Sequence, residues 1–107
     1  MPYYLIQASY SAQSVAALVK NPQDRSTVVR PVVERAGGKL HGMWFAFGDY
    51  DVVAIVELPD NVTSASLALA IGATGAMSNF RTTALLTMAE AVEAMKKAGD
   101  AGYKAPR

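Results

Sequence analysis

The sequence predicts an α+β fold in which a four-stranded antiparallel sheet carries helices on one face. Two observations predict it. Segments in which apolar residues alternate with a period of two are interleaved with segments of helical spacing, in the order β-α-β-β-α-β-α. The second and third strands are separated only by a short turn, which is typical of an antiparallel hairpin. This order is that of the ferredoxin-like fold. The chain of 107 residues suffices for one domain, expected over residues 1–98, with a tail at residues 99–107.

The first strand is predicted over residues 3–10, where aromatic and branched side chains alternate between two faces. Ser11 is the expected N-cap of a short helix over residues 12–20. Asn21-Pro22 should end that helix and begin a second one, because Asn caps helices and Pro fits the first helical position.

The second helix is expected to reach about residue 36, with Pro31 weakening or kinking it. Gly37-Gly38 is typical of a helix end in the left-handed conformation. The second and third strands are expected over residues 39–47 and 51–58, joined by a turn at residues 48–50.

Asp60 or Asn61 is the expected cap of a helix of small residues that ends near residue 73. The fourth strand is predicted over residues 80–88, and a C-terminal helix follows over residues 89–98, ended by Gly99.

The strands are apolar on both faces, and this predicts self-association. By simple alternation the second strand places Leu40, Trp44 and Ala46 on one face and Met43, Phe45 and Phe47 on the other. Helices can cover only one face of the sheet, so the other would expose a large apolar surface. We therefore expect a homodimer or higher oligomer in which the sheets of two copies face each other, as in a dimeric α+β barrel.

The composition argues against several classes of partner. Ten Lys and Arg against nine Asp and Glu leave a formal charge of +1, so neither nucleic acid nor a membrane surface is an expected partner. There is no Cys and a single His, so no metal and no cofactor are expected. No signal segment or membrane span is visible, and a cytoplasmic location is expected.

Five short segments together carry a family resemblance: Gly48-Asp49-Tyr50-Asp51, Gly37-Gly38-Lys39, Glu57-Leu58-Pro59-Asp60, Leu67-Ala68-Leu69-Ala70 and Arg81-Thr82. With them the chain resembles the GYD domain family from residue 3 to about residue 88. The resemblance implies small bacterial proteins related to the dimeric α+β barrel group. That group includes cofactor-independent monooxygenases, isomerases and ligand-sensing regulators, so the resemblance supports the fold and leaves the function open.

The Gly-Asp-Tyr-Asp motif has a structural and a functional interpretation. In the structural one, Gly48 and Asp49 form the turn and Asp51 accepts backbone N–H groups across it. In the functional one, Tyr50 and Asp51, with Asp49 nearby, line the mouth of a pocket and orient a ligand or transfer a proton. Adjacent strand residues point to opposite faces, which argues against Tyr50 and Asp51 acting as one pair.

The remaining candidates come from the second and fourth strands. Trp44, Phe45 and Phe47, with Met43, are expected to line an apolar ligand pocket. His41 shares the alternation of Met43 and Phe45, and this places it near the entrance of that pocket. His41, Tyr50 and Asp51 are therefore the candidate catalytic groups. Arg81 is a candidate partner for a ligand carboxylate or for an Asp of the motif.

These features favour a homo-oligomeric protein that binds a small molecule, or serves an accessory or regulatory role, without a cofactor. One alternative is a small cofactor-independent enzyme, similar to a monooxygenase or isomerase, that acts on an apolar or aromatic substrate. A structural assembly subunit is the third possibility.

Overall fold

A computed structural model describes all 107 residues and contains one four-stranded sheet. Along the chain the elements are β1 (Tyr3–Tyr10), α1 (Ala12–Lys20), α2 (Ser26–Arg35), β2 (Lys39–Phe45), β3 (Val52–Glu57), α3 (Asn61–Gly72), β4 (Met77–Leu85) and α4 (Met88–Gly99). The strand order is β2-β3-β1-β4, and all neighbours are antiparallel. The predicted ferredoxin-like α+β fold is thereby confirmed.

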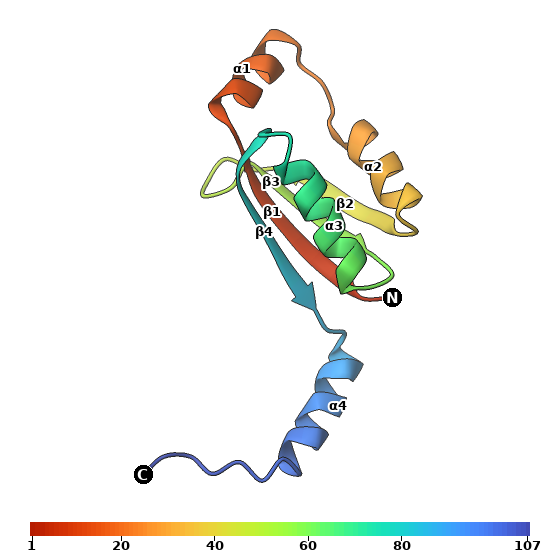
Figure 1. Cartoon of the computed structure of the whole chain (residues 1–107), viewed down its shortest axis with the longest axis vertical. Helices are drawn as coiled ribbons and strands as arrows, with labels where there is room; N and C mark the ends of the chain where they lie inside the picture. The colour runs from red at the N-terminus through yellow and green to blue at the C-terminus, as the bar shows by residue number, and fades with distance from the viewer.

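Helices cover one face of the sheet only. α2 and α3 lie on that face, which we call the helix side (Figure 1). α1 lies beyond one end of the sheet, and α4 projects beyond the other (Figure 1). We call the face without helices the open face. None of the helices is long and apolar enough to cross a membrane.

The core lies on the helix side. Six buried side chains form it. Tyr4, Leu40, Ala54 and Val56 come from the strands, Leu58 directly follows β3, and Val33 comes from α2. The hydroxyl of Tyr4 donates a hydrogen bond to Oδ1 of Asn61, 2.6 Å away, at the start of α3. This bond satisfies the one polar atom that Tyr4 brings into the core.

A β-bulge in β2 changes which side chains share a face. Leu40 pairs with Val56 and Gly42 pairs with Ile55, so that His41 is an extra residue in β2. The expected grouping of Leu40 with Trp44, and of His41 with Met43, is therefore wrong. Leu40 faces the helix side together with Met43, because each pairs with a buried residue of β3.

The second helix begins later than predicted. α2 begins at Ser26, and residues 21–25 form an irregular connection from α1. Asp24 provides the reason, because its Oδ1 accepts hydrogen bonds from Ser26 N–H at 2.9 Å and from the Ser26 hydroxyl at 2.6 Å. This local competition favours a turn before the helix over an earlier helix start at Pro22.

The last strand and helix are also shifted. β4 covers Met77–Leu85 rather than residues 80–88, and β2 ends at Phe45 rather than Phe47. Thr87 and Glu90 form a capping box that starts α4, since Thr87 Oγ1 accepts from Glu90 N–H at 3.1 Å and Glu90 Oε1 accepts from Thr87 N–H at 2.9 Å. The bonds from Thr87 hold the pKa of Glu90 below its usual value.

The predicted glycine stop of α2 is confirmed. Gly37 has a φ of +87°, and Gly38 N–H donates to the Val33 carbonyl at 3.0 Å. Gly38 packs directly against the end of β3. A Cβ on Gly38 would lie 2.7 Å from Cδ2 of Leu58 and closer still to the Glu57 carbonyl oxygen.

We expect Gly38→Ala to lower the free energy of unfolding by about 2–3 kcal/mol, because the backbone at Glu57 must move to admit the methyl group. Gly72→Ala is the matched control, since nothing lies within 4 Å of the Cβ position at Gly72. Urea unfolding of both variants measures the difference, and equal stabilities would contradict the close packing at Gly38.

Candidate functional site

A cavity opens on the helix side, between α1, α2, α3 and the sheet. Its volume is about 480 Å³, and most of the residues that line it are apolar. Its apolar wall includes Leu18 of α1, Val29 and Val33 of α2, Met43 of β2, and Leu67 and Ile71 of α3.

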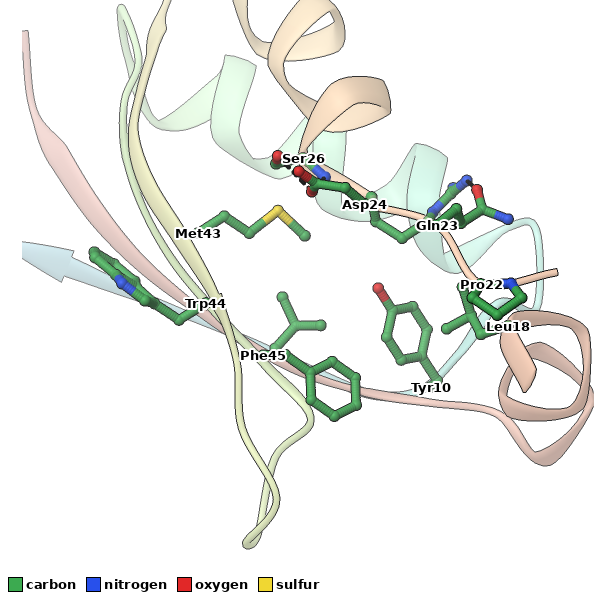
Figure 2. A pocket seen from close by; sticks show the side chains of 11 residues that line it. Tyr10, Leu18, Pro22, Gln23, Asp24, Ser26, Met43, Trp44 and Phe45 are labelled. Carbon is green, nitrogen blue, oxygen red and sulfur yellow. Dashed lines mark hydrogen bonds between the residues drawn. The ribbon is translucent and has the colours of Figure 1, made fainter.

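A second pocket of about 320 Å³ lies beneath the connection of residues 21–26 (Figure 2). Met43 and Phe45 point into this pocket from β2, and the ring of Tyr10 faces them from the end of β1 (Figure 2). The two spaces share five lining residues, Tyr10, Leu18, Gln23, Arg25 and Met43. They are therefore adjoining parts of one site, which we call the helix-side cleft.

The two parts of the cleft share three polar side chains, those of Tyr10, Gln23 and Arg25. Burial raises the pKa of the Tyr10 hydroxyl, the positive charge of Arg25 opposes that rise, and the negative charge of Asp51 adds to it. The Tyr10 hydroxyl is therefore protonated at neutral pH and is able to donate a hydrogen bond.

Arg25 stands at the cleft without an anionic partner. Its Nη1 donates to Oε1 of Gln23 at 2.9 Å, and the salt bridges of the structure join other residues. The neighbouring Asp24 is engaged by Ser26, whose hydrogen bonds lower the pKa of the Asp24 carboxyl. The cleft thus combines a long apolar wall with a cation and a hydroxyl donor.

The Gly-Asp-Tyr-Asp motif holds the end of β1, where Tyr10 lies. Oδ2 of Asp51 accepts a hydrogen bond from Tyr10 N–H at 3.0 Å, and Asp51 N–H donates to the Ala8 carbonyl at 2.9 Å. The Asp51 carboxylate thereby takes the place of a backbone carbonyl beyond the last β1–β3 pair, Ala8 and Val52. The hydroxyl of Ser9 also donates to the Asp49 carbonyl at 3.2 Å.

The other residues of the motif lie outside the cleft. Tyr50 is half-buried and Asp49 is exposed, and neither lines the cavity or the adjoining pocket. Phe47 is 95% exposed in the loop between β2 and β3.

The residues predicted to form one aromatic pocket are divided between the two faces. Phe45 and Met43 point into the cleft, whereas the ring of Trp44 points away from it (Figure 2). Arg81 pairs with Gln7 in the β1–β4 ladder, and Gln7 pairs with Val53 and Val53 with Trp44. Trp44 and Arg81 therefore lie in one row on the open face.

The candidate catalytic groups do not converge. His41 lies on the open face, where its Nε2 is 2.9 Å from Oε1 of Glu57 and its ring stacks on Tyr3 with 5.1 Å between ring centroids. Tyr50 lies in the loop between β2 and β3, and Asp51 bonds the backbone of β1. No group of three or more His, Asp or Glu side chains gathers as a metal site.

Tyr10 and Arg25 were not singled out from the sequence as ligand-binding residues. Tyr10 alternates in phase with Tyr4 and Ala8, which predicts that it faces the helices. Arg25 falls within the longer second helix that the sequence predicts, and only the observed start of α2 at Ser26 places it in the connection beside Tyr10.

The fold and the cleft together define an α+β protein of the ferredoxin-like class. Within that class the chain belongs to the GYD domain family, whose domain matches residues 4–95. The match extends beyond the predicted limit near residue 88 and includes most of α4. No curated protein matches the chain significantly.

We expect Asp51→Ala to lower the free energy of unfolding by about 1–3 kcal/mol, because the Tyr10 N–H then loses its charged acceptor. Asp49→Ala is the control, since the Asp49 side chain is exposed and only its carbonyl forms a hydrogen bond. Thermal and urea unfolding compare the two variants. An Asp51→Ala protein as stable as Asp49→Ala would contradict the structural role of the motif.

Proposed function

We propose that this protein binds a small, mostly apolar molecule with a single acidic group in the helix-side cleft. The observation that carries the proposal is the guanidinium of Arg25, which has no anionic partner and lies beside Tyr10 at the edge of an apolar cavity. We assign binding rather than catalysis, because His41, Tyr50 and Asp51 do not meet at one reacting centre.

The size and chemistry of the cleft support this proposal. Ligand pockets in proteins typically span about 300–1,000 Å³, are mainly apolar, and contain a few polar groups that fix the orientation of the ligand. A volume of about 480 Å³ lies within that range. A guanidinium binds a carboxylate through two parallel hydrogen bonds, and a protonated Tyr donates a third. The hydrocarbon part of the ligand would then lie along Val29, Met43 and Ile71.

We further propose that the protein functions as a homodimer through the open face. Leu5 pairs with Ile55 on that face, Val53 lies two residues before Ile55 in the same strand, and no helix covers the face. Trp44 in the adjacent strand is 57% exposed. A second copy presents the same apolar surface, and two-fold association is the commonest way to cover it. The clefts on the two helix sides remain accessible in such a dimer.

The ligand proposal is tested with decanoate, and decanol serves as the neutral ligand of equal chain length. We expect Arg25→Gln to weaken decanoate binding about tenfold or more, because the guanidinium–carboxylate pair is lost, and to leave decanol binding within about twofold. Isothermal titration calorimetry measures both affinities.

Arg35→Gln is the matched control, since it removes the same charge at the exposed end of α2, away from the cleft. Equal loss of decanoate affinity in Arg25→Gln and Arg35→Gln would contradict a specific role of Arg25. Failure of wild-type protein to bind either decanoate or decanol would overturn the proposed cleft function.

The dimer proposal is tested by Ile55→Lys, which places a charge in the middle of the open face. We expect wild-type protein to sediment as a dimer at micromolar concentration and Ile55→Lys to sediment as a monomer, because an unpaired charge cannot be buried between apolar sheets. Val62→Lys, at a position of α3 that is 79% exposed, should remain dimeric. A monomeric wild-type protein would contradict this proposal.

A further inference from the structure

α4 stands clear of the domain that precedes it. The helix projects from the end of β4 and does not turn back over the sheet (Figure 1). It forms no extensive contact with any other helix or strand. The chain is consequently long for its size, with a radius of gyration of 17.2 Å. A compact domain of this length has a radius of gyration of about 13 Å.

One side of α4 is an apolar stripe of Met88, Val92 and Met95, which recur at spacings of four and three residues. Their exposed fractions are 78%, 46% and 66%. The opposite side is charged, with Glu90, Glu93 and Lys97. This amphipathic pattern is that of a helix that packs one side against protein, yet nothing in its own chain covers the stripe.

The sequence defines this helix strongly at its start. Thr87 and Glu90 form a capping box, and Lys97 lies 3.8 Å from Glu93 at the i, i+4 spacing. An isolated helix of this length is nevertheless marginal in water, because most helix stability in proteins comes from packing of the apolar face. A 12-residue helix with these exposures therefore requires a packing surface.

The accessible surface area of the chain is larger than that of a compact monomer of the same mass. The chain exposes 7695 Å², whereas a compact monomer of 11.3 kDa exposes about 5,700 Å². The excess is about 2,000 Å² per chain and includes the exposed C-terminal residues 100–107 as well as the open face and α4. It is more than twice the roughly 800 Å² that each partner buries in a stable interface. This area is sufficient for a second copy to cover both the open face and the apolar stripe.

We infer that α4 is an arm that packs its apolar stripe against a second copy of this chain. α4 does not pack on its own sheet, with which it makes no extensive contact (Figure 1). The family match runs to residue 95 and therefore includes the whole stripe. The stripe carries no charge, as expected for a surface that meets the apolar surface of another copy.

The inference extends the proposed homodimer and does not depend on ligand binding. In a two-fold dimer each copy gives one arm and receives one, so both stripes are covered at once. The arm and the open face then bury different surfaces of the same assembly, and a variant in one leaves the other intact.

The test compares two double variants of the full chain. Val92→Asp with Met95→Asp places two charges on the stripe, whereas Glu93→Asp with Lys97→Asp places two aspartates on the charged side. Both pairs lower the net charge by two. The control pair costs the helix at least as much propensity, because it replaces two strong helix formers, whereas Val and Asp have similar propensities. A greater loss in the stripe variant therefore does not come from helix propensity. Hydrogen–deuterium exchange of the α4 amides is measured for both at micromolar concentration.

We expect the α4 amides to be protected in the wild type and in Glu93→Asp/Lys97→Asp. In Val92→Asp/Met95→Asp that protection should fall about tenfold or more, while the amides of β1 and β3 keep theirs. Equal protection of α4 in the two double variants would overturn the inference. Loss of β1 and β3 protection together with that of α4 would also overturn it, since the arm would then be part of the domain's own core.

A photo-crosslinker identifies the surface that the arm contacts. Benzoylphenylalanine is placed at Met95 in an equal mixture of isotope-labelled and unlabelled copies, and mass spectrometry determines which copies are joined. We expect crosslinked peptides that combine a labelled and an unlabelled copy. If sedimentation shows that the wild-type protein is a dimer, crosslinks only within one copy, or no crosslinks at all, would contradict the inference. Ile55→Lys separates the two proposals, because it disrupts the open face and leaves the stripe unchanged.

Discussion

The sheet of this protein carries apolar side chains on both faces, and on the open face they lie among polar ones such as Gln7, Arg81 and Glu57. Its helices cover only one of the two faces. This imbalance governs much of the structure. On the helix side, Tyr4, Leu40 and Val56 form a buried core beneath α2 and α3. On the open face, Ile55 and Trp44 have no helix over them. The same chain therefore has one face that its own helices cover and one that they leave open, and the open one is the face for which we propose a partner.

Hydrogen bonds to the end of β1 connect the Gly-Asp-Tyr-Asp motif with the candidate site. Asp51 accepts the N–H of Tyr10 and so fixes the end of β1, from which the Tyr10 ring enters the cleft. The motif residues themselves lie outside the cavity. The motif thus shapes the cleft through the backbone, and the side chains that face the cleft come from elsewhere in the chain.

The cleft and α4 are two places where the chain leaves apolar surface uncovered. At the cleft, α1 lies beyond the sheet rather than over it, so an apolar space remains between the sheet and the connection that holds Arg25. At the C-terminus, α4 presents an apolar stripe that no part of the chain covers. We propose a small molecule for the first surface, because it is concave and carries a cation. For the second we propose another copy of the chain, because the stripe is extended and uncharged.

The sequence by itself determined the order of the elements, the antiparallel hairpin, the glycine stop at Gly37-Gly38 and the family, since each depends on local alternation, turn chemistry or a contiguous motif. It did not determine which side chains share a face in β2, because the bulge at His41 is visible only in the pairing with β3. It also could not bring Arg25 beside Tyr10, because that depends on the path of residues 21–25 between α1 and α2. Only the tertiary structure decided that α4 leaves the domain, because a capping box and an apolar stripe fix a helix and its packing side but not the surface on which it packs.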